Sequence, residues 1–176
     1  VDNGEVTFTV NIPSGWNLLS PPIDVANKSM GNILSGVDNA AALSFNSTDD
    51  QWRFFKNESS HSLSTLGIPQ GFWLKAASSV NLSFIGAQVA YPIAFPLLHG
   101  WNLISYPSLQ AKNVSDAMAQ VNGSISMVFS YQNNAWFTYN HLRNASLNTL
   151  TSLTPGLGYW VYAKDDMELT FDGVFR

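Results

Sequence analysis

The chain contains no cysteine, so disulfide bonds and cysteine-ligated metal sites are excluded. Charged residues occupy only 11% of its 176 positions, whereas an average soluble domain has about 25%. The eight Lys and Arg form no basic run, so the electrostatic footprint of nucleic-acid binding or of a membrane-surface helix is missing. No apolar run approaches the roughly 18 residues that a spanning helix needs.

The composition still provides ample material for a folded core, because 45% of the residues are hydrophobic and 13% are aromatic. Soluble proteins usually keep apart through surface charge and hydration, and a net charge of -4 is a small one for this purpose. Glycans, neighbouring subunits or an acidic medium would each compensate for the missing charge.

Acceptor sites for N-glycosylation, Asn-x-Ser/Thr without proline, are about twice as frequent as chance predicts. Seven occur, whereas random placement of 17 Asn and 30 Ser and Thr gives roughly three. They begin at Asn27, Asn46, Asn57, Asn81, Asn113, Asn122 and Asn144. Most lie in expected loops and indicate a secreted, N-glycosylated surface, although Asn- and Ser-rich loops also generate such sites by accident. Asn81 opens an expected strand and must face outward there to be used.

The strongest signal is an internal repeat. Gly-Trp-Asn-Leu-Leu-Ser at 15–20 returns as Gly-Trp-Asn-Leu-Ile-Ser at 100–105. Further matches follow in the same order: Leu43-Ser44-Phe45 with Met127-Val128-Phe129, Trp52 with Trp136, Leu63 and Leu66 with Leu150 and Leu153, and Gly71-Phe72-Trp73 with Gly158-Tyr159-Trp160. The chain is therefore expected to form two modules, 1–87 and 88–176, docked end to end.

Each copy has the pattern of a mainly β unit. Val6, Phe8, Val10 and Ile12 alternate with polar residues, which predicts a half-buried strand. About six short strands are expected per copy, the last two forming a hairpin, with one short helix capped by Ser29 in the first copy and by Asn113 in the second. We therefore expect two tandem, homologous, small β-sandwich or barrel-like modules, each with one short helix.

The segments 15–20 and 71–73, with Pro-Gly-Leu-Gly-Tyr-Trp at 155–160, resemble the GWNL-x-S repeat modules of archaeal and bacterial secreted and cell-surface proteins, including S-layer-like chains. The resemblance covers essentially the whole chain, and the first copy departs from it with Pro-Gln-Gly-Phe-Trp at 69–73. It implies an extracellular, non-catalytic role, and it brings no catalytic residue.

Candidate catalytic and metal-binding chemistry is sparse. His61, His99 and His141 occupy unmatched places in the two copies, and none has the spacing of a zinc site. The acidic pairs 49–50 and 165–166 could bind Ca²⁺, but they are more simply turn residues. Neither a G-x-S-x-G motif nor a P-loop is present. We expect no enzyme, no cofactor and no metal.

The six tryptophans recur in pairs, and core packing is the simplest role for them. Trp52 and Trp136 follow polar hairpin turns, which makes them the best candidates for exposure. An exposed indole could stack on a sugar ring or on a neighbouring subunit.

These patterns favour a structural subunit of a glycosylated extracellular assembly, such as a filament, a pilus-like thread or a surface layer. Its partners would be copies of itself and N-linked glycans. The strand with Val6, Phe8, Val10 and Ile12 could add to a sheet edge of the next subunit and produce head-to-tail growth. Alternatively, each module owns the strand that precedes it. The other candidate function is a carbohydrate-binding or adhesive module pair of a larger secreted protein, which predicts exposed aromatics on one face and a polysaccharide partner.

Overall fold

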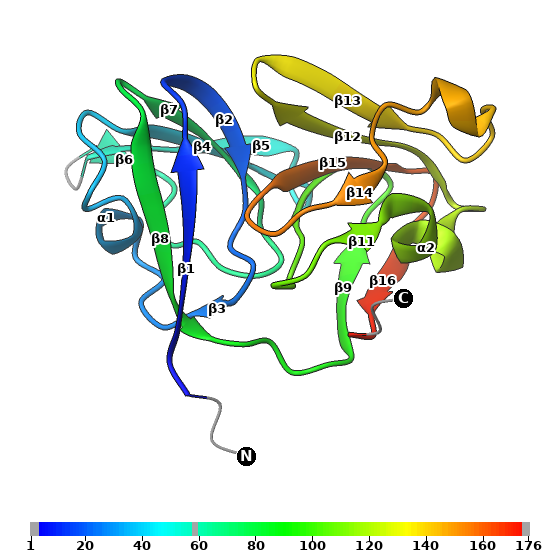
Figure 1. Cartoon of the computed structure of the whole chain (residues 1–176), viewed down its shortest axis with the longest axis horizontal. Coiled ribbons are helices and arrows are strands. Elements are labelled where there is room, and N and C mark those ends of the chain that lie inside the picture. Colours follow the sequence, from blue (N-terminus) through cyan, green and yellow to red (C-terminus); the bar gives the residue numbers. More distant parts are fainter. Residues whose placement is uncertain (1–3, 58–59, 174–176) are drawn as a thin grey trace.

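The computed structural model describes residues 4–57 and 60–173, which form two β-rich modules packed side by side (Figure 1). The first module contains β1 (Val6–Ile12), β2 (Gly15–Leu19), β3 (Asp24–Val25), α1 (Met30–Ile33), β4 (Ala41–Asn46), β5 (Gln51–Asn57), β6 (Ser60–His61), β7 (Phe72–Ala76) and β8 (Val80–Ala87). The second contains β9 (Ile93–Leu97), β10 (Gly100–Ser105), β11 (Lys112–Asn113), α2 (Val114–Met118), the 3-10 turn η1 (Ala119–Val121), β12 (Ile125–Gln132), β13 (Ala135–Tyr139), the 3-10 turn η2 (Ala145–Leu147), β14 (Ser152–Leu153), β15 (Gly158–Ala163) and β16 (Met167–Phe171).

The predicted class, mainly β with one short α-helix per module, is confirmed. The first module has a five-stranded sheet, β2-β7-β4-β5-β6, and a three-stranded sheet, β1-β8-β3. The second has the corresponding sheets β10-β15-β12-β13 and β9-β16, with a small pair β11-β14. The architecture is sandwich-like, and among the described residues no sheet closes into a barrel. Ser29 and Asn113 cap the helices as predicted, accepting hydrogen bonds from Asn32 N and Ser115 N.

One bent antiparallel ribbon connects the two sheets of each module. In the first module β1 and β2 run opposite β8 and β7, from Val6 facing Gly86 to Leu19 facing Phe72. In the second module β9 and β10 run opposite β16 and β15 in the same way. The expected final hairpin was therefore wrong, because β7 and β8 lie in different sheets. The short polar linker between β7 and β8 is compatible with a corner between two sheets as well as with a hairpin turn.

The repeated Gly-Trp-Asn motif forms the corner of this ribbon. Gly15 and Gly100 have φ of 96° and 98°, a region in which a Cβ atom is strained. The Asn17 side-chain amide then donates to Pro13 O at 3.0 Å, and the Asn102 amide donates to Leu98 O at 2.7 Å. The motif thus brings the chain from one sheet to the other and satisfies the carbonyls of the bend.

Each module has its own core, and the two cores lie on either side of the expected boundary at 87/88. The first extends from Ile12 to Phe84 and the second from Phe95 to Phe171. In the first core, Leu19 and Phe72 of the large sheet pack with Phe84 of the small sheet. Fully burying side chains of this kind stabilises a fold by about 1.5–3 kcal/mol each.

The modules dock through a pair of equivalent contacts, as expected for approximate two-fold symmetry. Ser20 N donates to Gly156 O at 2.9 Å, and the equivalent Ser105 N donates to Pro69 O at 2.8 Å. Isolated β-bridges join Leu19 to Leu157 and Gln70 to Ile104 beside these bonds. The expectation of modules docked end to end was wrong. The end of β2 pairs with the segment that precedes β15, and the end of β10 pairs with the segment that precedes β7.

The glycines of the Gly-aromatic-Trp motif permit this close approach. A Cβ on Gly71 would lie 2.8 Å from Ile104 O, and one on Gly158 would lie 2.6 Å from Leu19 O. Contacts this short require a backbone shift. The motif that marks the repeat therefore belongs to the docking surface between the modules as well as to each core.

The structure also corrects the alignment of the two copies at one strand. Ser44 Oγ donates to Gly71 O at 2.8 Å, and Ser130 Oγ donates to Gly158 O at 3.1 Å. Phe45 and Tyr131 each lie opposite the first tryptophan of the following strand. Leu43-Ser44-Phe45 therefore matches Phe129-Ser130-Tyr131, and the match to Met127-Val128-Phe129 was wrong by two residues.

Candidate functional site

A continuous aromatic surface extends over both modules, on the sides of the two large sheets that face away from the cores. Neighbouring rings contact one another, with centroid separations between 5.1 and 6.4 Å. We call this surface the tryptophan face. Its members are Trp16, Phe45, Trp52, Trp73, Trp101, Phe129, Tyr131, Trp136, Trp160 and Tyr162.

No tryptophan belongs to either core. Trp52 and Trp136 are 48% and 53% exposed, Trp16 and Trp101 are also exposed, and Trp73 and Trp160 are half-buried. The expectation that core packing accounts for these residues was wrong. Strand alternation is the reason, because Phe72 and Leu74 point into the core and leave Trp73 on the opposite side.

The face is shared by the two modules through an exchange of side chains. Trp160 of the second module packs against Phe45 at 5.4 Å and Trp52 at 5.7 Å. Trp73 of the first module packs in the same way against Trp136 at 5.7 Å, so each module supplies an indole to the hairpin of the other. Aromatic packing of this kind fixes ring positions and contributes about 0.5–1.5 kcal/mol per pair beyond area burial.

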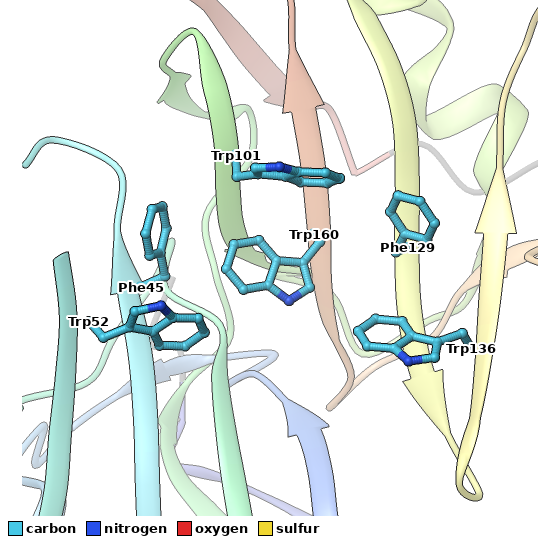
Figure 2. Close-up of a pocket in the computed structure, with 6 residues that line it drawn as sticks. All are labelled: Phe45, Trp52, Trp101, Phe129, Trp136 and Trp160. Atoms are coloured by element: carbon cyan, nitrogen blue, oxygen red, sulfur yellow. The ribbon is translucent and has the colours of Figure 1, made fainter. Parts of the chain in front are cut away.

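The exposed rings surround an apolar groove of about 440 Å³ (Figure 2). Its lining consists of Phe45, Trp52, Trp101, Phe129, Trp136 and Trp160. In Figure 2, Trp160 lies between Trp52 of the first module and Trp136 of the second. Because its walls come from both modules, the groove exists only when the modules are docked.

A second groove of about 350 Å³ lies on the same face, at the position related by the approximate two-fold symmetry. It is lined by Trp16, Leu43, Trp52, Trp73 and Tyr131. The two grooves differ where the copies have diverged. Leu43 occupies the place of Phe129. Outside the groove linings, Lys75, whose ammonium lies 5.9 Å from the Trp16 ring centre, occupies the place of Tyr162. The first groove is thus the larger and the more aromatic.

Four of the sequons share one local geometry. The side-chain oxygens of Asn27, Asn46, Asn113 and Asn144 each accept a hydrogen bond, at 2.9–3.1 Å, from the backbone N–H of the hydroxyl residue two positions later. This turn leaves the side-chain nitrogen, which would carry the glycan, outside that bond. Asn27, Asn113 and Asn144 are exposed, and Asn46 is half-buried.

The remaining sequons have different surroundings. Asn81 is exposed on β8, as its use requires, and accepts a hydrogen bond from the Asn11 amide. The side-chain oxygen of Asn122 is buried without a hydrogen-bond partner. Asn57 ends β5, but its side chain and Ser59, the hydroxyl residue of the sequon, are outside the described residues. None of the sequon side chains that the structure describes belongs to the tryptophan face.

The expected assembly strand is paired within its own chain. Val6, Phe8, Val10 and Ile12 belong to β1, which pairs with β8, just as β9 pairs with β16. The structure thus has the arrangement in which each module owns the strand that precedes it. Phe8 and Val10 also lie close to Gly156 of the second module, so β1 contributes to the docking of the two modules.

Two exposed leucines went unnoticed in the sequence. Leu142 and Leu147 are 74% and 62% exposed in the loop that follows β13. The sequence contains an indication of their exposure, because they are leucines in a mainly polar loop. The first copy has no leucine in the corresponding segment 56–62.

The residues considered for metal binding are dispersed. Within 4–57 and 60–173, no three His, Asp or Glu side chains lie together in a way that could hold a metal ion. Asp49 instead forms an ion pair with Arg53, and Asp166 accepts a hydrogen bond from His99 N at 2.8 Å. No helix in the described part of the chain is long and apolar enough to cross a membrane.

Comparison with known proteins adds no relative: no family model, no curated protein and no solved structure matches the chain.

Proposed function

We propose that the chain is a non-catalytic structural subunit of an extracellular, glycosylated assembly, and that the tryptophan face is its contact surface. One observation carries the proposal: the indoles of both modules converge on a single exposed face that surrounds an apolar groove. Monomeric soluble proteins rarely expose apolar patches of this kind, and such patches usually mark interaction sites. The rings are also held by mutual packing, so little conformational entropy is lost when a partner binds.

The distribution of polar groups supports the same proposal. Charge is scarce over the whole chain, and none of the described sequon side chains belongs to the tryptophan face. Glycans on Asn27, Asn81 and Asn113 would therefore cover other surfaces and leave the face accessible. An interface core depleted in charge and enriched in Trp and Tyr is typical of binding hot spots.

A carbohydrate-binding module pair is the second candidate, and one observation favours it. Trp52 and Trp136, the most exposed indoles, lie on the same face and both line the larger groove. Exposed indoles on one face are what sugar stacking requires. In this case the partner is a polysaccharide, and the chain stays monomeric without it.

A pair of variants with a matched control tests the proposal. Trp52→Ala with Trp136→Ala removes the two most exposed rings, and Ile85→Ala removes an apolar side chain that is 47% exposed on β8, away from the face. We expect concentration-dependent association of the wild type in sedimentation velocity, weakened at least tenfold in the tryptophan variant and unchanged in the control. A wild type that stays monomeric and is retained by a polysaccharide panel through Trp52 and Trp136 would replace the first candidate with the second.

Glycosylation and localisation are tested on native material. We expect peptide mass spectrometry to find N-glycans on the exposed Asn27, Asn81 and Asn113, in material recovered from the cell surface or the medium. Unmodified Asn at all three sites in protein from inside the cell would contradict the extracellular part of the proposal.

A further inference from the structure

Among the residues that the structure describes, the two most exposed large apolar side chains lie outside the tryptophan face. They are Leu142 and Leu147, in a loop at 140–148 that we call the leucine loop. The loop is seen in Figure 1 as the orange turn at the far end of the second module. Solvent-exposed leucines at this level are unusual when they lie together in one short loop, and they are absent from the matching segment of the first module.

The leucine loop is ordered by its own hydrogen bonds. Asn148 closes it, because its side chain accepts from Asn140 N at 2.9 Å and donates to Asn140 O at 3.2 Å. Within the loop, Leu142 N donates to the Asn140 side chain at 2.9 Å, and Leu147 N donates to Asn144 O at 2.9 Å. The two leucines therefore project from a preorganised turn.

The larger groove is complementary to this loop. It is apolar, it is lined by six aromatic side chains, and its volume of about 440 Å³ exceeds that of two leucine side chains. Asp50 is exposed in the β4–β5 turn, two residues before the groove-lining Trp52, and the leucine loop carries the exposed Arg143. Among the described residues neither of these charges forms an ion pair, so each is available to the other.

A chain cannot place its own loop in its own groove. β13 leads away from the groove and separates Trp136 from Asn140 by roughly 13 Å of extended strand. Figure 1 shows the loop at the opposite end of the second module from β4 and β5. Any occupant of this kind must come from another molecule.

We propose that the leucine loop of one chain docks in the larger groove of the next chain, with Leu142 and Leu147 against the indoles and Arg143 beside Asp50. This inference rests on the proposed function and names the partner of its contact surface, a second copy of the chain. The contact joins two different surfaces and therefore does not close on itself, so it repeats into a head-to-tail polymer. It requires no exchange of β1.

The sequon at Asn144 lies between the two leucines. A glycan there would prevent the loop from entering the groove, so chains within the polymer carry a bare Asn144. Ser146→Ala removes the sequon but keeps the Asn144 side chain that accepts from the backbone N–H of residue 146. We expect Ser146→Ala to assemble at least as well as the wild type from a glycosylating host.

Mixing two association-deficient variants tests the contact directly. The loop variant is Leu142→Ser with Leu147→Ser, the groove variant is Trp52→Ser with Trp136→Ser, and the control is Ile85→Ser. We expect each deficient variant alone to associate at least tenfold more weakly than the wild type. The loop variant should keep the wild-type Tm, whereas the groove variant should have a lower Tm, because it loses the contacts of Trp52 with Trp160 and of Trp136 with Trp73, and should still unfold cooperatively. An equimolar mixture should form 1:1 dimers and no polymer, because only one productive loop and one productive groove remain.

The other possible results distinguish a failure of the leucine-loop docking from a failure of the proposed function. If the loop variant polymerises like the wild type while the groove variant does not, the docking of the leucine loop is wrong and the tryptophan face remains the contact surface. If the wild type is monomeric in all conditions, with or without Ser146→Ala, both proposals fail. In that case retention on a polysaccharide column through Trp52 and Trp136 would identify a carbohydrate as the occupant of the groove.

Discussion

Trp73 and Trp160 are equivalent residues of the two modules, and each packs against the aromatic hairpin of the other module. Trp73 lies 5.3 Å from Tyr131 and 5.7 Å from Trp136, measured between ring centroids. Trp160 makes the corresponding pair of contacts with Phe45 and Trp52. The reciprocal exchange means that the surface proposed for binding also stabilises the docking of the modules.

Trp73→Ala and Trp160→Ala should therefore destabilise the chain by similar amounts. Each removes two ring contacts between modules, and at about 0.5–1.5 kcal/mol per aromatic pair the loss is roughly 1–3 kcal/mol. Urea unfolding measures it. Trp16→Ala is the control, because its ring contact is with Trp73 of its own module. An equal loss for all three variants would show that the ring contacts between modules contribute no more to stability than the contact of Trp16 within its own module.

Gly71→Ala and Gly158→Ala should weaken the docking of the modules. The added Cβ would meet Ile104 O or Leu19 O below 3.0 Å, and relief of such overpacking typically costs about 1–3 kcal/mol. Gly123→Ala, where a Cβ would meet nothing within 4 Å, is the matched control. Differential scanning calorimetry should show a lower Tm for the first two only.

Ser20 and Ser105 are equivalent and fully buried, but their hydroxyls differ. Ser20 Oγ donates to Leu157 O at 2.6 Å and accepts from Tyr106 N at 3.3 Å, whereas Ser105 Oγ has no hydrogen-bond partner. Ser20→Ala should destabilise the chain by about 1–3 kcal/mol, because it leaves a buried N–H unsatisfied. Ser105→Ala should be neutral or stabilising. Equal losses in guanidinium unfolding would contradict this difference.

Stability should fall at alkaline pH because of a buried tyrosine. Burial raises the pKa of Tyr106 from 10.0 to about 12, and its hydroxyl donates to Gln110 O at 2.8 Å. Between about pH 10 and 12 the unfolded chain loses this proton and the folded chain keeps it, so stability decreases as pH rises. Below pH 10 the contribution is fully present.

The slope in that window is about 1.4 kcal/mol per pH unit for one such tyrosine. Tyr106→Phe should reduce the slope of the unfolding free energy against pH by this amount, measured by urea titrations between pH 8 and 11.5. The variant should also be less stable below pH 10, because the hydrogen bond to Gln110 O is lost. Burial also raises the pKa of Tyr159, so part of the alkaline slope should remain in this variant. An unchanged slope would show that Tyr106 ionises equally in both states.

The repeat and the strand content could be predicted because they depend on short-range patterns. Alternation identified β1, and turn residues identified the hairpin between β4 and β5. The alignment at Phe129 failed because a shift of two residues along a strand preserves the alternation of faces. The correct alignment is determined by the hydrogen bonds of Ser44 and Ser130 and by the strand pairing of Phe45 and Tyr131.

The candidate site was predictable only in part. The polar turns before Trp52 and Trp136 indicated exposure for those two residues. The tryptophan face could not be predicted, because both sides of the strand formed by Gly-Trp-Asn-Leu-Leu carry apolar residues. The sequence does not show which side packs against a core. Leu18, for example, is fully buried on the side of Trp16. The partner of each indole depends on the docking of two modules, which no local pattern encodes.

The approximate symmetry of the modules is broken both at the groove and at the leucine loop, and in the proposed contact these differences would give the chain a direction. A true dimer of identical modules would present two identical grooves and two identical loops, and its contacts would branch into a network. Here Phe129 is replaced by Leu43 in the smaller groove, and the leucines of the 140–148 loop have no counterpart in the first module. With the leucine loop docked as proposed, these differences would give each subunit one donor end and one acceptor end, and growth from such a unit would be linear and polar.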